Sequence, residues 1–164
     1  GHIKGLGVFV AETALAFAYE SLASIAEKAV AVGVALCVEN MPTNCNAFVE
    51  PDDFNPLFKR FPEFRMTLDV GHANIDDKSG GRPTAFIHRF GDRIDHLHFS
   101  DNKGKRDDHI RLGKGRVDLK GIGRALKKIG YDGTATLEIF SDKVSDLTES
   151  LAYVKALMGP EESV

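Results

Sequence analysis

Hydrophobic and polar positions divide the chain into two alternating kinds of segment. Residues 11–32 have apolar side chains at helical spacing, and Gly33 is placed to end that helix. Residues 34–38 then form a short, continuous apolar run that stops abruptly at Glu39. A run that is apolar on both faces is typical of a strand in a parallel sheet covered by helices. The positions with helical spacing in the first segment are Leu15, Leu22, Ile25, Ala29 and Val32.

The strand pattern returns three more times, with helical segments between the runs. Residues 64–68 lead into Asp69, residues 93–97 into His98, and residues 134–137 into Glu138. The spacing predicts helices over residues 52–61, 84–90, 119–129 and 145–158. In the third of these, Asp118 is a natural N-cap and Gly130 a C-terminal stop. Alternating strands and helices without hairpin signals predict a parallel α/β sheet with right-handed crossovers.

All four predicted strands end at a side chain that can bind a metal ion, namely Glu39, Asp69, His98 and Glu138. The carboxyl ends of parallel strands meet at one edge of the sheet, which is where α/β folds bind ligands. Carboxylates gathered at that edge would repel one another, and a divalent cation removes the conflict. Carboxylate with imidazole suits Mn²⁺, Zn²⁺, Fe²⁺ or Co²⁺, and Mg²⁺ is compatible. Taken singly, each residue is more simply a capping, solvated or semi-buried side chain, so the argument depends on their shared position.

Further candidate ligands lie shortly after these strand ends. His72 follows the second strand across a glycine, which allows a tight turn that folds the imidazole back over the strand end. Asp107 and His109 have the i, i+2 spacing that points both side chains the same way in extended backbone. The alternative for this loop is a solvated charged surface, given its basic residues Lys103, Lys105, Arg106 and Arg111. His96 sits deeper on the third strand, where a core role is expected.

Two glycine pairs resemble nucleotide-binding motifs without fitting them. Gly113-Lys114-Gly115 is too short for a P-loop and lacks its earlier glycine. Gly121 and Gly123 fall inside a predicted helix, so they do not form a dinucleotide-binding turn. Gly113 and Gly115 instead allow the loop after the third strand to lie close over a ligand.

Composition narrows the class of protein. The chain has 164 residues, 43% of them apolar, and a net charge of −3. This content suits one domain with a hydrophobic core, and the acidic balance makes a nucleic-acid partner unexpected. Cys37 and Cys45 are not spaced as a disulfide framework. The cysteine pattern leads us to expect a reduced, cytoplasmic setting. Because no apolar run approaches the ~20 residues that span a bilayer, we expect no membrane segment.

Four strands are fewer than a closed barrel needs. A full (β/α)₈ barrel usually takes about 250 residues. A four-stranded half would leave the first and last strands with open edges that invite pairing with another chain. Three arrangements remain: further residues precede this chain, two copies associate to cover the edges, or the sheet is an ordinary open α/β sheet.

Five segments, in this order, resemble the xylose-isomerase-like TIM-barrel superfamily, which includes sugar phosphate isomerases and epimerases and family 2 AP endonucleases. They are residues 38–42 (Val-Glu-Asn-Met-Pro), 68–72 (Leu-Asp-Val-Gly-His), 96–102 (His-Leu-His-Phe-Ser-Asp-Asn), 107–115 (Asp-Asp-His-Ile-Arg-Leu-Gly-Lys-Gly) and 137–139 (Leu-Glu-Ile). Their order matches strands five to eight of that barrel. The resemblance implies that residues 1–164 are a single domain, the C-terminal half of a TIM-type (β/α) barrel.

The resemblance to the sugar epimerases also implies roles for individual residues. One divalent metal ion (Mn, Zn, Co or Mg) is expected at Glu39, Asp69, His98 and Glu138. The two glutamates would also act as an acid/base pair on opposite sides of the substrate carbon. His72, Asn40 and His109 are expected to bind substrate. In the AP-endonuclease branch, His72, Asp107 and His109 join the metal ligands in a three-zinc site that also uses histidines from earlier strands.

These patterns and the resemblance are compatible with three alternative functions. The first is isomerisation or epimerisation of a sugar or sugar phosphate through an enediolate-like intermediate, with the metal as Lewis acid and Glu39 or Glu138 moving the proton. The second is metal-dependent phosphodiester hydrolysis at abasic DNA, for which residues 103–116 are the only basic candidate surface. The third is an inactive fragment that keeps the ligand pattern and lacks its partner half. A homodimer covering the open edges would restore an eight-stranded barrel.

Overall fold

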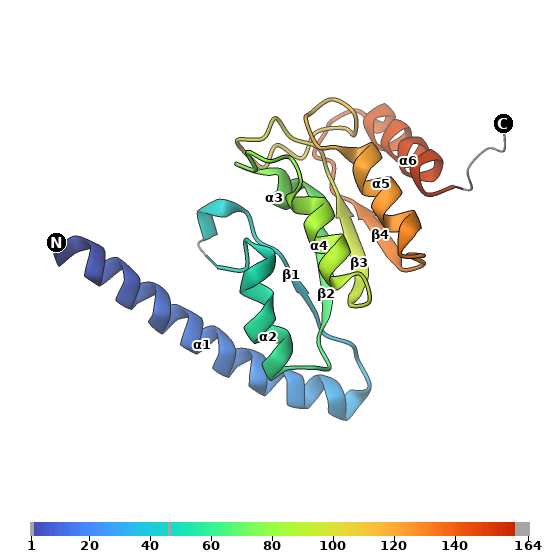
Figure 1. Cartoon of the computed structure of the whole chain (residues 1–164). Helices are drawn as coiled ribbons and strands as arrows, with labels where there is room; N and C mark the ends of the chain where they lie inside the picture. Colours follow the sequence, from blue (N-terminus) through green and yellow to red (C-terminus); the bar gives the residue numbers. More distant parts are fainter. Residues whose placement is uncertain (1, 46, 160–164) are drawn as a thin grey trace.

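Four parallel strands form a single sheet with the order β1-β2-β3-β4 (Figure 1). The computed structural model describes residues 2–45 and 47–159, with side chains from residue 13 onward. The strands are β1 (Cys37–Glu39), β2 (Arg65–Asp69), β3 (Ile94–Phe99) and β4 (Thr134–Leu137). The predicted parallel α/β architecture is therefore confirmed, although β1 is shorter than the apolar run at residues 34–38 suggested.

Helices follow every strand, as the alternating pattern predicted. They are α1 (His2–Val32), α2 (Phe54–Arg60), α3 (Val70–Asn74), α4 (Arg82–Phe90), α5 (Leu119–Lys128) and α6 (Val144–Met158), with short 3₁₀ turns at Thr43–Cys45 and Pro51–Asp53. Asp118 caps α5 by accepting a hydrogen bond from the backbone N–H of Gly121 at 2.9 Å. The short helix α3 begins directly at the end of β2 and was not predicted.

The strand register brings the ends of the strands to the same level. Asp69 lies directly across from His98 in the β2–β3 pair, and Glu39 lies across from Thr67 on β2. The backbone N–H of Glu138 donates to the carbonyl of the residue after His98 at 3.0 Å. Since side chains alternate between the two faces of a strand, these residues project from the same face of the sheet.

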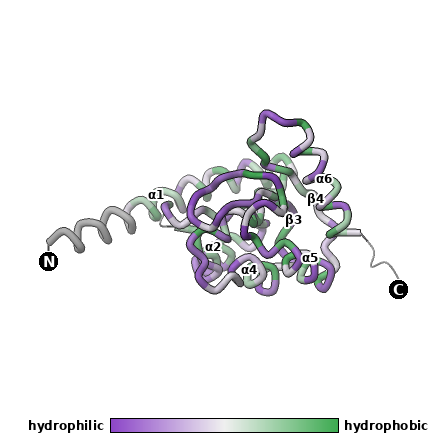
Figure 2. Tube along the Cα trace, turned by 90° about the horizontal axis from the view of Figure 1, so that it is seen from above, coloured by the Kyte–Doolittle hydropathy of each residue, from purple (hydrophilic) through white to green (hydrophobic). Residues whose placement is uncertain are grey.

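An aromatic cluster fills the space between the sheet and the helices on its other face. Figure 2 shows α2, α4 and α5 in one row outside the strands. Phe54 on α2 is fully buried and contacts Phe58, Phe86 and Phe90 at ring-centroid distances of 5.7, 5.5 and 6.2 Å. Together with the apolar side chains of β2 and β3, this cluster makes the core.

The packed face of α1 differs from the predicted one. Tyr19, Leu22, Ala23 and Ala26 pack against the core, whereas Leu15, Ile25 and Val32 are 39%, 47% and 72% exposed. Only part of the apolar surface of α1 is therefore covered by the described residues. Within those residues, none of the helices could serve as a bilayer-spanning segment.

The second face of the sheet is open in this chain. Thr134 and Thr136 of β4 are exposed on this face, and β1 and β4 each pair with one neighbour among the described strands. His96, which we expected in the core, lies half-exposed on this face and hydrogen-bonds the hydroxyls of Thr134 and Thr136. The expectation failed because the side of the sheet that carries His96 is not covered.

Replacing Phe54 by alanine tests the aromatic core. Removing this fully buried ring should destabilise the chain by about 3–5 kcal/mol, because the cavity loses both apolar burial and ring contacts. Urea unfolding measures the change. Phe17, 63% exposed on α1, provides the control: Phe17→Ala should cost about 0.5 kcal/mol or less. Equal effects of the two substitutions would contradict this assignment of the core.

Candidate metal and substrate site

The four predicted metal ligands converge around the imidazole of His98. Its Nδ1 lies 3.1 Å from Glu39 Oε1, 3.2 Å from Glu138 Oε1 and 3.8 Å from Asp69 Oδ2. Glu39 and Asp69 are the last residues of β1 and β2, His98 precedes the last residue of β3, and Glu138 follows β4. Residues that span a hundred positions of the sequence thus meet at one rim because successive parallel strands end there.

Asp69 has the most unusual environment of the four. Its side chain is fully buried; Oδ1 accepts a hydrogen bond from the backbone N–H of His72 at 2.7 Å, while Oδ2 has no hydrogen-bond partner among the described residues. Burial raises the pKa of this carboxyl to about 6, against the opposing attraction of His72. A buried carboxylate oxygen with no partner, beside two more carboxylates and an imidazole, fits a divalent cation.

A second group of possible ligands lies beside the first. Asp107 Oδ2 is 3.0 Å from His72 Nε2 and 2.9 Å from His109 Nε2. One ligand atom from each of these three residues can be chosen within 4.8 Å of the others, as is also true of Glu39, Asp69 and His98. Asp107 Oδ1 is buried without a hydrogen-bond partner. The Asp-x-His pair therefore turns toward the rim, and the alternative of a solvated charged loop does not describe these two side chains.

His72 connects the two groups. Its Nδ1 is 2.9 Å from the carbonyl oxygen of Asn40 and 3.5 Å from Glu39 Oε1, while its Nε2 faces Asp107. Burial lowers the pKa of His72, but the neighbouring carboxylates of Asp69, Asp107 and Glu39 and the Asn40 carbonyl outweigh burial, so the pKa is raised overall.

Asn40 and Gly71 have structural roles that differ from the predicted substrate contact and tight turn. Asn40 is fully buried, and its amide donates to the carbonyl of Asp69 at 3.0 Å and accepts from the Asp69 N–H at 2.8 Å. It fastens the ends of β1 and β2 together instead of facing a ligand. Gly71 lies within α3 instead of forming a tight turn, and a methyl group at its Cα would collide with the Ser100 hydroxyl.

Phe140 is a rim residue that the sequence reasoning missed. Its ring stacks on His109 with a centroid distance of 4.1 Å and an interplanar angle of 21°, and the side chain is 75% exposed. An apolar aromatic two positions after Glu138 was the available signal. It was overlooked because an aromatic side chain after a strand is most simply a core residue.

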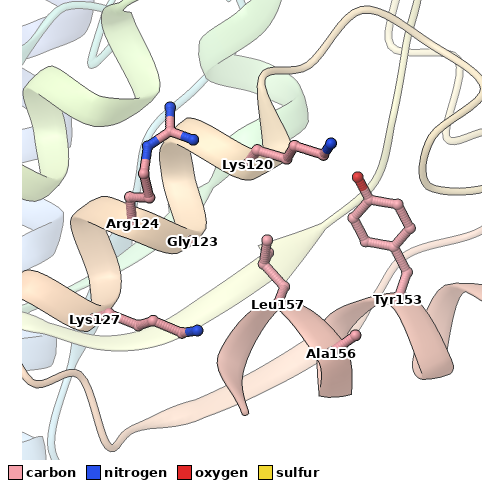
Figure 3. Close-up of a pocket in the computed structure, with 7 residues that line it drawn as sticks. All are labelled: Lys120, Gly123, Arg124, Lys127, Tyr153, Ala156 and Leu157. Carbon is pink, nitrogen blue, oxygen red and sulfur yellow. The ribbon is translucent and has the colours of Figure 1, made fainter. Parts of the chain in front are cut away.

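A cleft of about 390 Å³ between α5 and α6 is separate from this rim (Figure 3). It is lined by Lys120, Gly123, Arg124, Lys127, Tyr153, Ala156 and Leu157. With basic side chains and no carboxylate or imidazole, this lining does not suit a divalent cation. The candidate metal ligands lie at the strand ends instead.

Comparison with known proteins matches this architecture. The family model described as xylose isomerase-like TIM barrel covers residues 4–158. D-psicose 3-epimerase of Ruminiclostridium cellulolyticum is 30% identical over 131 residues, which make up 74% of this chain and 40% of that protein. An uncharacterised protein of Methanocaldococcus jannaschii is 29% identical over 143 residues, 84% of this chain and 47% of that protein.

A solved structure shows the same arrangement of elements. The crystal structure of a D-tagatose 3-epimerase-like protein superposes with a TM-score of 0.72 at 29% identity, covering 85% of this chain and 52% of that one. The chain spans about half the length of the curated relatives it matches. Its four strands and their helices therefore correspond to about half of a TIM-type barrel.

The substitution Asp69→Asn tests the electrostatic strain at the rim. The pKa of Asp69 is raised from 3.8 to about 6 in the folded chain, so its contribution to stability is fully present below the lower value and is lost as the pH rises through the upper one. The amide keeps an oxygen acceptor for the His72 N–H and removes the charge. At neutral pH without metal, the variant should be more stable than the parent by on the order of 2 kcal/mol.

Urea unfolding in the presence of a chelator, repeated between about pH 4 and pH 7, measures this difference. The advantage of Asp69→Asn should be small at the acidic end and grow toward neutrality. An advantage that stays constant over the range, or a variant less stable than the parent at neutral pH, would show that the buried carboxylate is not strained.

Proposed function

This chain belongs to the xylose isomerase-like TIM-barrel family, and we propose that it supplies the metal-binding and proton-transferring side of a sugar epimerase or isomerase site. The observation that carries the proposal is the convergence of Glu39, Asp69 and Glu138 on His98 Nδ1. Sugar epimerases among the relatives support the choice of substrate class. The substrate is a small sugar or sugar phosphate.

A single divalent ion would be held by carboxylate oxygens and one imidazole nitrogen, from Glu39, Asp69, His98 and Glu138. Mn²⁺, Zn²⁺, Co²⁺ and Mg²⁺ are the candidates for this mixed oxygen and nitrogen set. The ion supplies Lewis-acid polarisation of the substrate oxygens when bound. The orphaned Oδ2 of Asp69 supports this assignment, since the strain of a buried, unpaired carboxylate disappears when a cation binds it.

Glu39 and Glu138 are the residues placed to move a proton. Their side chains are 31% and 29% exposed, whereas Asp69 is fully buried, so both glutamates reach the open side of the rim where a substrate would sit. They stand on the first and last strands and approach His98 from either side. We infer that one glutamate, as a carboxylate, removes the proton next to the substrate carbonyl, and that the other, as a carboxylic acid, donates its own proton to the opposite face.

His72, His109 and Phe140 would complete the substrate side. His72 hydrogen-bonds Asp107, whose Oδ2 also lies 2.9 Å from His109 Nε2, and His109 Nδ1 lies 3.0 Å from the backbone carbonyl of Glu138. Each imidazole is thereby fixed in orientation, and a sugar hydroxyl that binds its Nε2 would replace the contact of that nitrogen with Asp107. The exposed face of Phe140 offers an apolar surface beside them.

The His72–Asp107–His109 group favours a second candidate function. A further metal at this neighbouring group would resemble the clustered metal sites used for phosphodiester hydrolysis. The net charge of −3 counts against a DNA substrate. We therefore keep AP-endonuclease-like hydrolysis as the alternative, to be separated by the activity measurement below.

A second copy of the chain is the partner we propose for the open edges. β1 and β4 each have one paired side among the described strands, and all strands run in the same direction. A two-fold axis along the barrel would place β1 of one copy beside β4 of the other in parallel orientation, closing eight strands. This arrangement would also cover His96 and the exposed residues of β4.

Metal content and activity are tested together with Glu138→Gln. We expect the parent chain to retain about one divalent ion per rim after incubation with Mn²⁺, Zn²⁺, Co²⁺ or Mg²⁺ and gel filtration, and the variant to lose it. Epimerisation of a ketose should fall by about a factor of 10²–10⁴. Glu63→Gln, an exposed glutamate outside the rim, should change neither property.

Two results would contradict the proposal. One is a parent chain that stays metal-free with all of the ions. The other is nicking of abasic duplex DNA without any proton exchange on ketoses, which would instead establish the alternative function.

Light scattering on the purified chain tests the second copy. The expected mass is twice the 17.9 kDa of one chain. This mass should persist on dilution, because the same association pairs the strand edges and covers the open face of the sheet. A mass of one chain at all concentrations, with the sheet intact by circular dichroism, would exclude the closed pair.

A further inference from the structure

Asp101 is a buried carboxylate that the proposed chemistry does not use. It lies two residues after β3 and is fully buried. Its Oδ1 accepts hydrogen bonds from the backbone N–H groups of Asn102 and Val117 at 2.8 and 3.1 Å. Its Oδ2 accepts from those of Gly113 and Gly115 at 2.9 and 2.8 Å. Four backbone donors thus surround one carboxylate.

The glycine pair that does not fit a P-loop, Gly113 and Gly115, provides two of the backbone donors to this carboxylate. Gly113 has a φ of +80°, which favours glycine, and a Cβ at Gly115 would collide with the Asp101 carboxylate. The turn therefore wraps an anion as phosphate-binding loops do, but the anion is the chain's own side chain. The result is a closed loop from residue 102 to residue 117 with both ends fastened to Asp101.

This closed loop carries Asp107 and His109 of the second ligand group. Asp101 and Ile110 pair as an antiparallel bridge, with N···O distances of 3.1 and 2.9 Å, next to His109. His109 has a φ of +45° in the left-handed region, a conformation that costs energy for a residue with a side chain. Its carbonyl accepts from the Phe140 N–H at 2.9 Å. The backbone on both sides of the imidazole is thus held by fixed partners.

The same loop is fastened to the helix that carries His72. The Asn102 amide donates to the carbonyl of Gly71 at 2.8 Å, and the Asn74 amide donates to Asn102 Oδ1 at 2.8 Å. Both contacts lie in the buried layer beneath the rim, since Asn102 is fully buried. These buried hydrogen bonds therefore fix the distance between His72 and the Asp107–His109 pair.

We propose that Asp101 is a positioning residue, which holds the loop closed and keeps Asp107 and His109 within reach of His72 and Glu138. The inference rests on the proposed function only for what the positioned groups do; the positioning itself is a property of the chain. Without the carboxylate, the strained His109 backbone would relax and the imidazole would leave its partners. The first ligand group, on the strand ends, would stay in place because its residues are fixed by the sheet.

Asp101→Asn is the sharpest test, because it changes the charge and one acceptor without changing the size. The amide NH₂ cannot accept from the N–H groups of Gly113 and Gly115, so two of the four hydrogen bonds are lost. Asp118→Asn is the matched control: it changes an exposed carboxylate that accepts one backbone N–H at the start of α5, and asparagine caps helices equally well.

Two readouts on the metal-free full chain separate positioning from general destabilisation. The first is the rate of tryptic cleavage within residues 103–116, which should rise by at least about tenfold in Asp101→Asn as the loop opens more often. The second is the set of imidazole NMR resonances of His72 and His109, assigned with His72→Gln and His109→Gln variants. These resonances should shift in Asp101→Asn while the resonances of the β2 and β3 core remain.

Asp118→Asn should leave both readouts as in the parent. The proposal is overturned if Asp101→Asn leaves cleavage and the two imidazoles unchanged, or if every resonance of the chain changes together. Both readouts are independent of turnover and of metal, so they hold even if the parent chain proves inactive. Where epimerisation is measurable, kcat of Asp101→Asn should fall by about tenfold or more, with metal affinity at the strand ends within about threefold of the parent.

Discussion

The burial of a carboxylate beside other carboxylates at the strand ends is the constraint on which the candidate site depends. Parallel strands in register bring Glu39, Asp69 and Glu138 to the same rim, within 4 Å of His98 Nδ1. Asp69 is buried in the process, and its pKa rises because the charge has lost its water. A cation bound at the proposed site would relieve this strain, so the arrangement would cost less stability with the ion than without it.

Two kinds of scaffold hold the two halves of the site. The strand ends are fixed by the sheet, and the Asn40 side chain links the ends of β1 and β2 through two hydrogen bonds. Asp107 and His109 stand on a long loop, which has no ladder of its own. That loop needs an internal anchor, and a buried carboxylate surrounded by backbone N–H groups provides one. The difference explains why buried polar residues concentrate just below the rim.

The open face of the sheet is the other consequence of the fold. Parallel sheets are normally covered on both faces, yet β4 and His96 are exposed in this chain. Apolar residues on α1, such as Phe17 and Val30, are also uncovered at 63% and 65% exposure. The two expectations that failed, His96 in the core and Val32 on a packed face, concern residues on these uncovered surfaces.

Sequence alone determined the order of the four strands and the polar side chains that end them, because hydrophobic periodicity is local and each run stops at its polar residue. It also singled out Asp107 and His109, although its premise of extended backbone fails at His109, where φ is +45°. Only the tertiary structure decided what Asn40, Asp101 and Phe140 do, since a buried amide, a carboxylate held by distant N–H groups and a ring stacked on His109 depend on contacts between segments far apart in the chain. Local patterns specify elements, whereas the partner of a polar side chain is fixed only when those elements pack.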